Sequence, residues 1–384
     1  MNPALRVQLY FFVQFMSVGM VNAFAGIWFD TQGLSSVQIG ALSAIPNIVV
    51  LLIVVFVGRI ADRASDWRQV IIFCAIISAL TPIGLIYVTG FLGVLFFWSV
   101  GSIAQRTALP VSDAAGLRMA RREGLNFGAF RGLSTLGYLL VIIFAGFALQ
   151  DRGVEVFLPL FIGLGLLRGL TSLFLPKMRA PEAVHASRSA GNLRSLMKAW
   201  FLLPIIGYAL LDTPHLILNS FQGLLWARQG ISTETIGLLI ALGAAAETAM
   251  FFAFAHVAKR FPPITLLLIG VAASIFRWLA MATSPEVPAL IGLQTLHAVT
   301  YASAFLAITN YVADNVSEDN AAQAQSLIVN FELVLSSLGL MLFGWLVGHY
   351  GAYSYVASAA MAAIAGILIL LGRQMRPADE ATSS

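Results

Sequence analysis

Charged residues are scarce in this chain of 384 residues, where Asp, Glu, Lys and Arg together make up 10%. A typical soluble domain carries about 25% charged residues, whereas 59% of this sequence is hydrophobic. Such a chain cannot cover its surface with polar groups in water. Its apolar stretches run on for about twenty residues, the length of one transmembrane helix, and not in the alternating segments of about ten residues that form a membrane β-barrel. We therefore predict a polytopic membrane protein of the all-α class.

Cysteine is limited to Cys74, which lies in an apolar run, so we expect neither a disulfide framework nor a cysteine-based metal site. The sequence also lacks a His-Glu-x-x-His motif and a glycine-rich phosphate loop. We expect no cofactor, no metal and no direct coupling to ATP, and we expect that the protein is not an enzyme. A channel would show rings of like ligands from repeated segments, and no such repeat is visible in the sequence.

Breaks marked by charged residues, Gly or Pro separate the apolar runs. The predicted spans are 7–29, 38–58, 70–89, 91–117, 125–149, 155–175, 200–226, 236–257, 264–283, 287–311, 324–347 and 352–372. The longest polar stretch between spans, residues 176–198, divides these twelve into two sets of six, as in transporters built from two repeated bundles. We predict a six-helix bundle at 1–176, a cytoplasmic linker at 177–198, a second six-helix bundle at 199–373 and a cytoplasmic tail at 374–384.

The distribution of Lys and Arg predicts the orientation. If the N-terminus is cytoplasmic, sixteen of the 22 Lys and Arg residues fall in cytoplasmic segments and only Arg152 and Arg228 fall in outer loops. This asymmetry predicts that both termini face the cytoplasm, and we expect a multi-pass protein of the bacterial inner membrane. The net charge of +4 is therefore a signal of topology, and we expect no nucleic-acid partner.

Ten ionisable residues nevertheless fall inside the predicted spans, where one charge costs about 2.5–3.5 kcal/mol on insertion scales. They are Arg106, Asp113, Arg131, Arg168, Asp212, His215, Glu247, Arg277, His297 and Glu332. Each one alone could form a structural ion pair. Together they predict a water-filled pathway for a solute between the two bundles.

Two clusters stand out among these residues. In the first half, Asp113 and Arg131 lie at similar depth in neighbouring spans, and Tyr138 shares the helix face of Arg131. In the second half, Glu247, Arg277 and His297 each lie near the middle of a span. We expect Arg277 to be held by Glu247 or His297. Since Arg does not lose its proton in practice, Glu247 and His297 are the titrating members.

The sequence resembles the major facilitator superfamily. Gly58, Asp62 and Arg63 in "GRIADRASDWR" match part of its inner-loop signature, and the resemblance implies that they act in the conformational gate. The chain resembles the proton-symporter group that contains lactose permease, and more closely the 3-phenylpropionate permease branch. "PVSD" and "FGAFR", ending at Asp113 and Arg131, match an acid–arginine pair that binds substrate in that group.

"GAAAE", "FRW" and "LQTLH" match the group's acid, arginine and histidine in the second half. Lactose permease has a proton-releasing glutamate three residues after the histidine, where this chain has Thr300, which cannot titrate. The 3-phenylpropionate permease branch resembles this chain in lacking the acid there. We therefore expect another carboxylate to couple protons, with Glu247 preferred, then Glu332, and with Asp212 and Asp113 as alternatives.

The resemblance implies a secondary transporter that works by alternating access with a small-molecule substrate, protons and the lipid bilayer as partners. We expect a monomer in which Asp113, Arg131, Tyr138, Arg277 and His297 bind substrate. Arginine suits an aromatic carboxylate because its guanidinium binds carboxylates in bidentate fashion and stacks on rings. A sugar or oligosaccharide, a nucleoside, or export of a small molecule remain alternatives.

Overall fold

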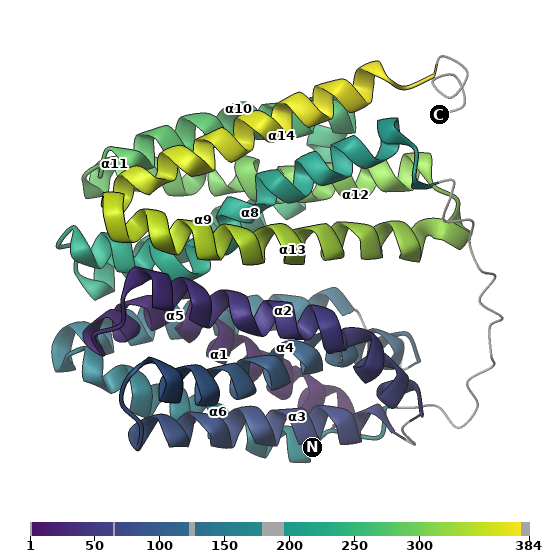
Figure 1. Cartoon of the computed structure of the whole chain (residues 1–384). Helices are drawn as coiled ribbons and strands as arrows, with labels where there is room; N and C mark the ends of the chain where they lie inside the picture. The colour runs from purple at the N-terminus through teal and green to yellow at the C-terminus, as the bar shows by residue number, and fades with distance from the viewer. Residues whose placement is uncertain (1, 64–65, 123–126, 179–195, 378–384) are drawn as a thin grey trace. The chain divides into compact units, whose positions relative to one another are not determined.

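The computed structural model describes residues 2–63, 66–122, 127–178 and 196–377; in addition, the side chains of 54–63, 121–122, 127–131, 318–319 and 321–322 are outside the description. Within these ranges the chain forms helices and short connections, with no strand (Figure 1). The first six long helices are α1 (Pro3–Thr31), α2 (Ser36–Arg63), α3 (Trp67–Leu80), α4 (Phe91–Arg122), α5 (Phe127–Arg152) and α6 (Phe157–Leu173). Short 3-10 turns at Thr81–Ile86 and Val154–Val156 extend α3 and precede α6.

The remaining helices are α8 (Ala199–Arg228), α9 (Thr233–Ala258), α10 (Pro263–Ala282), α11 (Val287–Thr295), α12 (Ala304–Asn315), α13 (Glu318–Tyr350) and α14 (Tyr355–Gln374). A π-helical turn, Ala298–Ser303, lies between α11 and α12, so these two helices form one continuous stretch, Val287–Asn315. A 3-10 turn at Gly351–Ser354 separates α13 from α14.

Twelve membrane-length segments can be counted in the described ranges. Ten stretches are long and apolar enough to cross a bilayer, and one of them, Gln323–Gln374, contains both α13 and α14. The twelfth segment is α4, a helix of 32 residues whose hydropathy is lowered by polar side chains such as Asp113. The predicted all-α fold of a multi-pass membrane protein is therefore confirmed.

The contacts divide the chain into two compact units, each of which is described by itself. The first unit comprises Met1–His185 and Asn219–Leu238, and the second comprises Ala186–Leu218 and Leu239–Ser384. The first unit thus contains α1–α6 together with the end of α8 and the start of α9. The predicted limits of the linker, bundles and tail remain a prediction.

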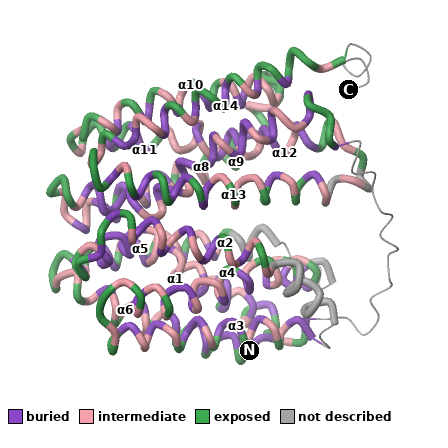
Figure 2. Tube along the Cα trace, viewed as in Figure 1, coloured by how far each residue is buried: buried purple, intermediate pink, exposed green. Residues whose placement is uncertain are grey.

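Burial separates interior helices from peripheral ones. In the most apolar stretch of α1, 67% of residues are buried, and in α8 the figure is 72%, against 22% in α9. Figure 2 shows the mixed burial along the helices. Large apolar side chains such as Leu92 and Phe252, 76% and 84% exposed, are what a lipid-facing surface requires, because lipid tails are as apolar as these side chains.

Aromatic side chains fill the interior of the first unit. Trp28 of α1 stacks on Phe157 of α6 at 5.5 Å between ring centroids, and Phe29 meets Trp98 of α4 edge to face at 4.7 Å. Stacked and edge-to-face geometries such as these are favoured by the ring quadrupoles. The aromatic contacts fix α1 between α4 and α6.

Glycines let the segment 219–238 pack closely on α1 and α5 within the first unit. A Cβ atom added at Gly223 would lie 2.2 Å from the carbonyl oxygen of Ala23, and one added at Gly237 would lie 2.8 Å from that of Ile142. Since real Cβ atoms do not approach backbone so closely, only glycine permits these contacts. The close packing of small residues is typical of membrane helices.

Polar contacts join the same segment to the ends of α1, α2 and α5. Arg228 donates to Asp30 at 2.5 Å and to the Ser36 hydroxyl at 3.1 Å. Thr233 donates through its hydroxyl to the carbonyl of Gly146 at 3.0 Å. The ion pair is about one-third exposed on both sides, so its contribution to stability is modest.

Candidate functional site

Arg277 is the centre of a polar cluster inside the second unit. It lies on α10 and is 0% exposed. One terminal nitrogen donates to the side-chain oxygen of Gln294 at 2.7 Å. The other donates to the Thr300 hydroxyl at 3.0 Å and lies 3.1 Å from Nδ1 of His297. The guanidinium also lies 4.9 Å from the ring centroid of Trp278, within the range of a cation–π interaction.

The donors of Arg277 determine which nitrogen of His297 carries the proton. A guanidinium can only donate, so Nδ1 of His297 must accept and cannot carry a hydrogen. The proton of the neutral ring is therefore on Nε2, which lies 3.5 Å from Oε2 of Glu247. The result is a series of polar contacts from Glu247 through His297 to Arg277.

The three predicted residues Glu247, His297 and Arg277 lie together, with His297 between the other two. Arg277 contacts His297 directly and reaches Glu247 only through that ring. The side chains of His297 and Glu247 are 19% and 26% exposed, while Arg277 is enclosed. In this arrangement the accessible groups are the histidine and the carboxylate, and Arg277 positions them.

The π-helical turn begins immediately after His297 and includes Thr300 and Tyr301. Such turns inside α-helices are frequently found at functional sites. Here the turn lies where Thr300 accepts from Arg277 and approaches Nε2 of His215 at 3.0 Å. Thr300 therefore has a structural role in joining α10 to α8, in a position where the resemblance led us to look for an acid.

Sequence reasoning missed two members of this cluster, Gln294 and His215. Gln294 is 2% exposed and donates to the carbonyl of Leu239 at 3.1 Å, which anchors Arg277 to α9. Its signal in the sequence is a lone amide three residues before His297. The ring of His215 lies 5.3 Å from that of His297, and the sequence placed His215 in a span without linking it to a site.

Two further carboxylates, Asp212 on α8 and Glu332 on α13, lie in the second unit. Asp212 is 5% exposed, and its Oδ1 has no hydrogen-bond partner among the described residues. Tyr208 is hydrogen-bonded to Glu332. Asp212 interacts electrostatically with both Glu332 and Glu247, and ionised carboxylates at close range repel one another.

The predicted residues of the first half lie on α2, α4 and α5. Asp113 of α4 is half-buried and interacts with neighbouring groups. The side chain of Arg131 lies outside the described residues, so the predicted Asp113–Arg131 pair remains a prediction. Tyr138 packs on α1 at Gly19.

The three residues of the predicted conformational gate, Gly58, Asp62 and Arg63, lie at the end of α2, and their side chains are outside the description. Arg168, also predicted to lie within a span, is 1% exposed on α6. It donates to the Ser78 hydroxyl of α3 at 2.7 Å, a contact that joins two helices of the first unit.

Comparisons with known proteins agree with this architecture. Maltose permease of Geobacillus stearothermophilus is 26% identical over 280 residues, which cover 72% of this chain and 70% of that protein. The "Probable 3-phenylpropionic acid transporter" of Escherichia coli K12 is 25% identical over 354 residues, 86% of either chain.

A crystal structure of the nucleoside transporter NupG has the same fold, with a TM-score of 0.82, 18% identity and coverage of 98% of this chain and 99% of that one. These proteins are permeases and transporters and not enzymes. The model of the protein family described as "MFS_1 like family" matches residues 4–357 of this chain. The chain therefore belongs to this family of major facilitator transporters.

Proposed function

We propose that this transporter is a proton symporter that imports a small organic solute, with aromatic carboxylates as the solute class. It acts as a monomer in the bacterial inner membrane, with both termini in the cytoplasm. The observation that carries the proposal is the series of contacts from Glu247 through His297 to Arg277, because it joins one titratable acid to a permanent cation within membrane spans.

Charge balance gives the coupling mechanism. With Glu247 ionised and Arg277 cationic, the cluster is neutral overall. A proton that arrives at Glu247 leaves the cation uncompensated, and an uncompensated charge within the hydrocarbon is costly. A carboxylate solute restores neutrality, so the proton and the anion enter together and leave together as the two bundles alternate access.

Glu247 is the proposed proton carrier because the alternatives near it are constrained. The Nδ1 of His297 already accepts from Arg277, so protonation of that nitrogen would break the contact. Thr300 does not titrate, and Arg277 does not lose its proton in practice. Glu332 and Asp212 are the next candidates because they interact with each other in the same unit.

Three successive stacked rings, those of His297, Tyr301 and Phe305, form an aromatic ladder that supports an aromatic solute. The His297 ring stacks on Tyr301 at 5.2 Å with 15° between the planes, and Tyr301 is nearly parallel to Phe305 at 6.4 Å. A solute ring next to this ladder gains stacking interactions, while its carboxylate provides the compensating charge. Asp113, Arg131 and Tyr138 are the proposed ligands from the first half.

A sugar is the second candidate solute, favoured by the similarity to maltose permease. Hydroxyl groups would bond to Glu247 and His297 without a compensating charge. A sugar is uncharged and therefore cannot compensate the charge of Arg277. An uptake experiment can distinguish the two solute classes because only the carboxylate provides this compensation.

Uptake into proteoliposomes tests the proposal. With an inwardly directed proton gradient, 3-phenylpropionate should accumulate, and maltose should not. Glu247→Gln should abolish accumulation driven by the gradient, while the control Glu286→Gln, at an exposed residue before α11, should behave as the unmodified protein. Uphill uptake by Glu247→Gln would mean that Glu332 or Asp212 carries the proton. Accumulation of maltose and not of 3-phenylpropionate would mean that the solute is a sugar.

A further inference from the structure

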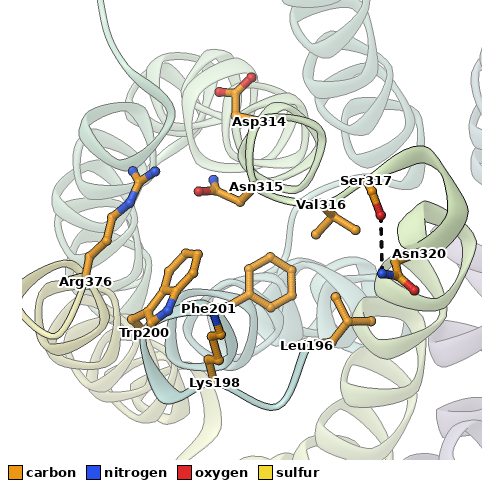
Figure 3. Close-up of a pocket in the computed structure, with 10 residues that line it drawn as sticks. All are labelled: Leu196, Lys198, Trp200, Phe201, Asp314, Asn315, Val316, Ser317, Asn320 and Arg376. Carbon is orange, nitrogen blue, oxygen red and sulfur yellow. Dashed lines mark hydrogen bonds between the residues drawn. The ribbon is translucent and has the colours of Figure 1, made fainter. Parts of the chain in front are cut away.

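Arg168 of α6 is a charged side chain to which the proposed function assigns no role. It lies inside the first unit and is 1% exposed. By contrast, Lys198 and Arg376, which line a cavity of about 490 Å³ at one end of the second unit (Figure 3), are at least partly exposed. A charge enclosed among membrane helices is costly, and such residues are rare unless they pair or serve a function.

The positive charge of Arg168 is not neutralised by any carboxylate of the described residues, because none of their ion pairs includes it. Nη2 donates to the Ser78 hydroxyl of α3 at 2.7 Å, whereas Nε and Nη1 have no hydrogen-bond partner there. A neutral hydroxyl orients the guanidinium but leaves its charge unchanged. Since Arg does not lose its proton in practice, a full positive charge remains inside the bundle.

Close packing of α6 on α3 encloses this arginine. A Cβ atom added at Gly165 would lie 3.4 Å from Cα of Ala79, and one added at Gly169 would lie 3.2 Å from Cβ of Ala79. These two glycines flank Arg168 along α6, so the two helices approach closely on both sides of it. The guanidinium is therefore held between helices and its charge is not screened by water.

Tyr10 of α1 connects Arg168 to α4. It is 1% exposed, is hydrogen-bonded to Ser112, and interacts electrostatically with both Arg168 and Asp113. Ser112 is 2% exposed, whereas Asp113, the next residue and turned by about 100° around the helix axis, is half-buried. The face of α4 that carries Ser112 therefore meets Tyr10, and the proposed solute ligand Asp113 borders that face.

The charges of the first half explain what an additional cation does. Asp113 repels a carboxylate solute, and its predicted partner Arg131 supplies one compensating positive charge. Arg168 supplies a second, so that these three groups together attract an anion. The attraction acts without contact, and it is stronger inside a protein than in water because the effective dielectric constant is lower.

We propose that Arg168 is a specificity-determining residue that makes the first-half site, formed by Asp113, Arg131 and Tyr138, selective for anionic solutes without touching them. Ser78 orients its guanidinium, and the charge acts across Tyr10. This inference rests on the proposed carboxylate solute and adds to it the origin of the preference for a charged group.

Binding of 3-phenylpropionate and of the uncharged 3-phenylpropionamide to the purified full-length protein tests this role. The two ligands share ring and chain and differ in charge, and calorimetry at neutral pH gives a Kd for each. In Arg168→Gln the preference for the carboxylate, expressed as the ratio of the two Kd values, should fall about fivefold. The Kd of the amide should stay unchanged, whereas a role limited to helix packing would weaken both ligands alike.

Three further variants separate the charge of Arg168 from its packing. Arg168→Lys keeps the charge and should retain the preference for the carboxylate. Ser78→Ala removes the hydrogen bond but not the charge and should retain it as well. Ser78→Asp keeps the arginine but places a carboxylate beside it, so the preference should fall as in Arg168→Gln. This last variant provides the same test if Arg168→Gln does not fold.

The outcomes distinguish this inference from the proposed function. Equal or undetectable binding of the two ligands by the unmodified protein would show that the proposed solute class is wrong, and this inference with it. If the unmodified protein prefers the carboxylate, and Arg168→Gln or Ser78→Asp keeps the same preference while circular dichroism shows it to be folded, only the role of Arg168 is wrong.

Discussion

At the scale of single residues, the ionisable side chains of the second unit differ in burial and in their contacts, which the sequence alone does not reveal. Arg277 is enclosed and bonds to Gln294, Thr300 and His297, whereas His297 and Glu247 retain some exposure. The cation thereby fixes the ring, and the ring fixes the position of the carboxylate. A planar guanidinium can reach several acceptors at once, which a lysine ammonium cannot do with the same geometry.

We expect Arg277→Lys to reduce proton-driven uptake roughly tenfold or more, because an acceptor that loses its donor in a buried site costs about 1–3 kcal/mol. The measurement is initial uptake rate in proteoliposomes at equal protein content. Arg260→Lys, at an exposed residue between α9 and α10, is the control. Unchanged transport by Arg277→Lys would show that transport does not need the planar guanidinium and its several donors.

A second prediction concerns the tautomer of His297. Nitrogen-15 NMR of protein labelled at histidine should show His297 neutral, with hydrogen on Nε2 and none on Nδ1, since Arg277 can only donate to Nδ1. In Arg277→Gln this assignment should be lost or mixed, because an amide can also accept. A signal from His297 with Nδ1 protonated in the unmodified protein would contradict the contact.

At the scale of elements, the α11–α12 stretch has an irregularity that no apolar pattern reveals. The π-helical turn at Ala298–Ser303 follows the histidine and contains the threonine that bonds to Arg277. Wider turns accommodate an extra residue in the helix, and successive residues of a regular α-helix are rotated by about 100°. The direction in which the side chains of α12 point, relative to those of α11, therefore depends on this turn.

Deletion of Val299 should restore a regular helix and rotate α12 relative to α11, so transport should fall to background while helical content remains. Circular dichroism and uptake assays measure the two properties on the same preparation. Val299→Ala, which keeps the number of residues, should transport normally. Full activity after the deletion would mean that the turn has no role in positioning Thr300.

The glycine contact between α8 and α1 is also a property of elements. We expect Gly223→Val to destabilise the packing of the segment 219–238, because a side chain there would collide with the Ala23 carbonyl. A lower melting temperature in detergent would report it. The matched control is Gly292→Ala, at a helical glycine with open space around it, and equal melting temperatures for the two variants would contradict the prediction.

At the scale of the whole molecule, continuous apolar runs were sufficient to predict the twelve-helix fold, because a membrane span needs about twenty apolar residues whatever its packing. The trio Glu247, Arg277 and His297 was also recognisable, since charges are rare in such runs. The roles of Gln294 and His215 were not, because burial and hydrogen bonding depend on which helix face meets which neighbour. The π-helical turn at Ala298–Ser303 contains neither glycine nor proline, so the sequence has no helix-breaking residue that would predict it.

The helix α8 belongs to both compact units, with residues 199–218 in the second and 219–228 in the first. If one unit rearranges, either the segment 219–238 detaches from α1 and α5, or two helices bend: α8 near Leu218, four residues beyond Pro214, and α9 near Leu238. Detachment would break the Arg228–Asp30 ion pair and separate Gly223 and Gly237 from the backbone carbonyls of Ala23 and Ile142. Because both α8 and α9 run without a break from one unit into the other, bending is confined to the residues near Leu218 and Leu238.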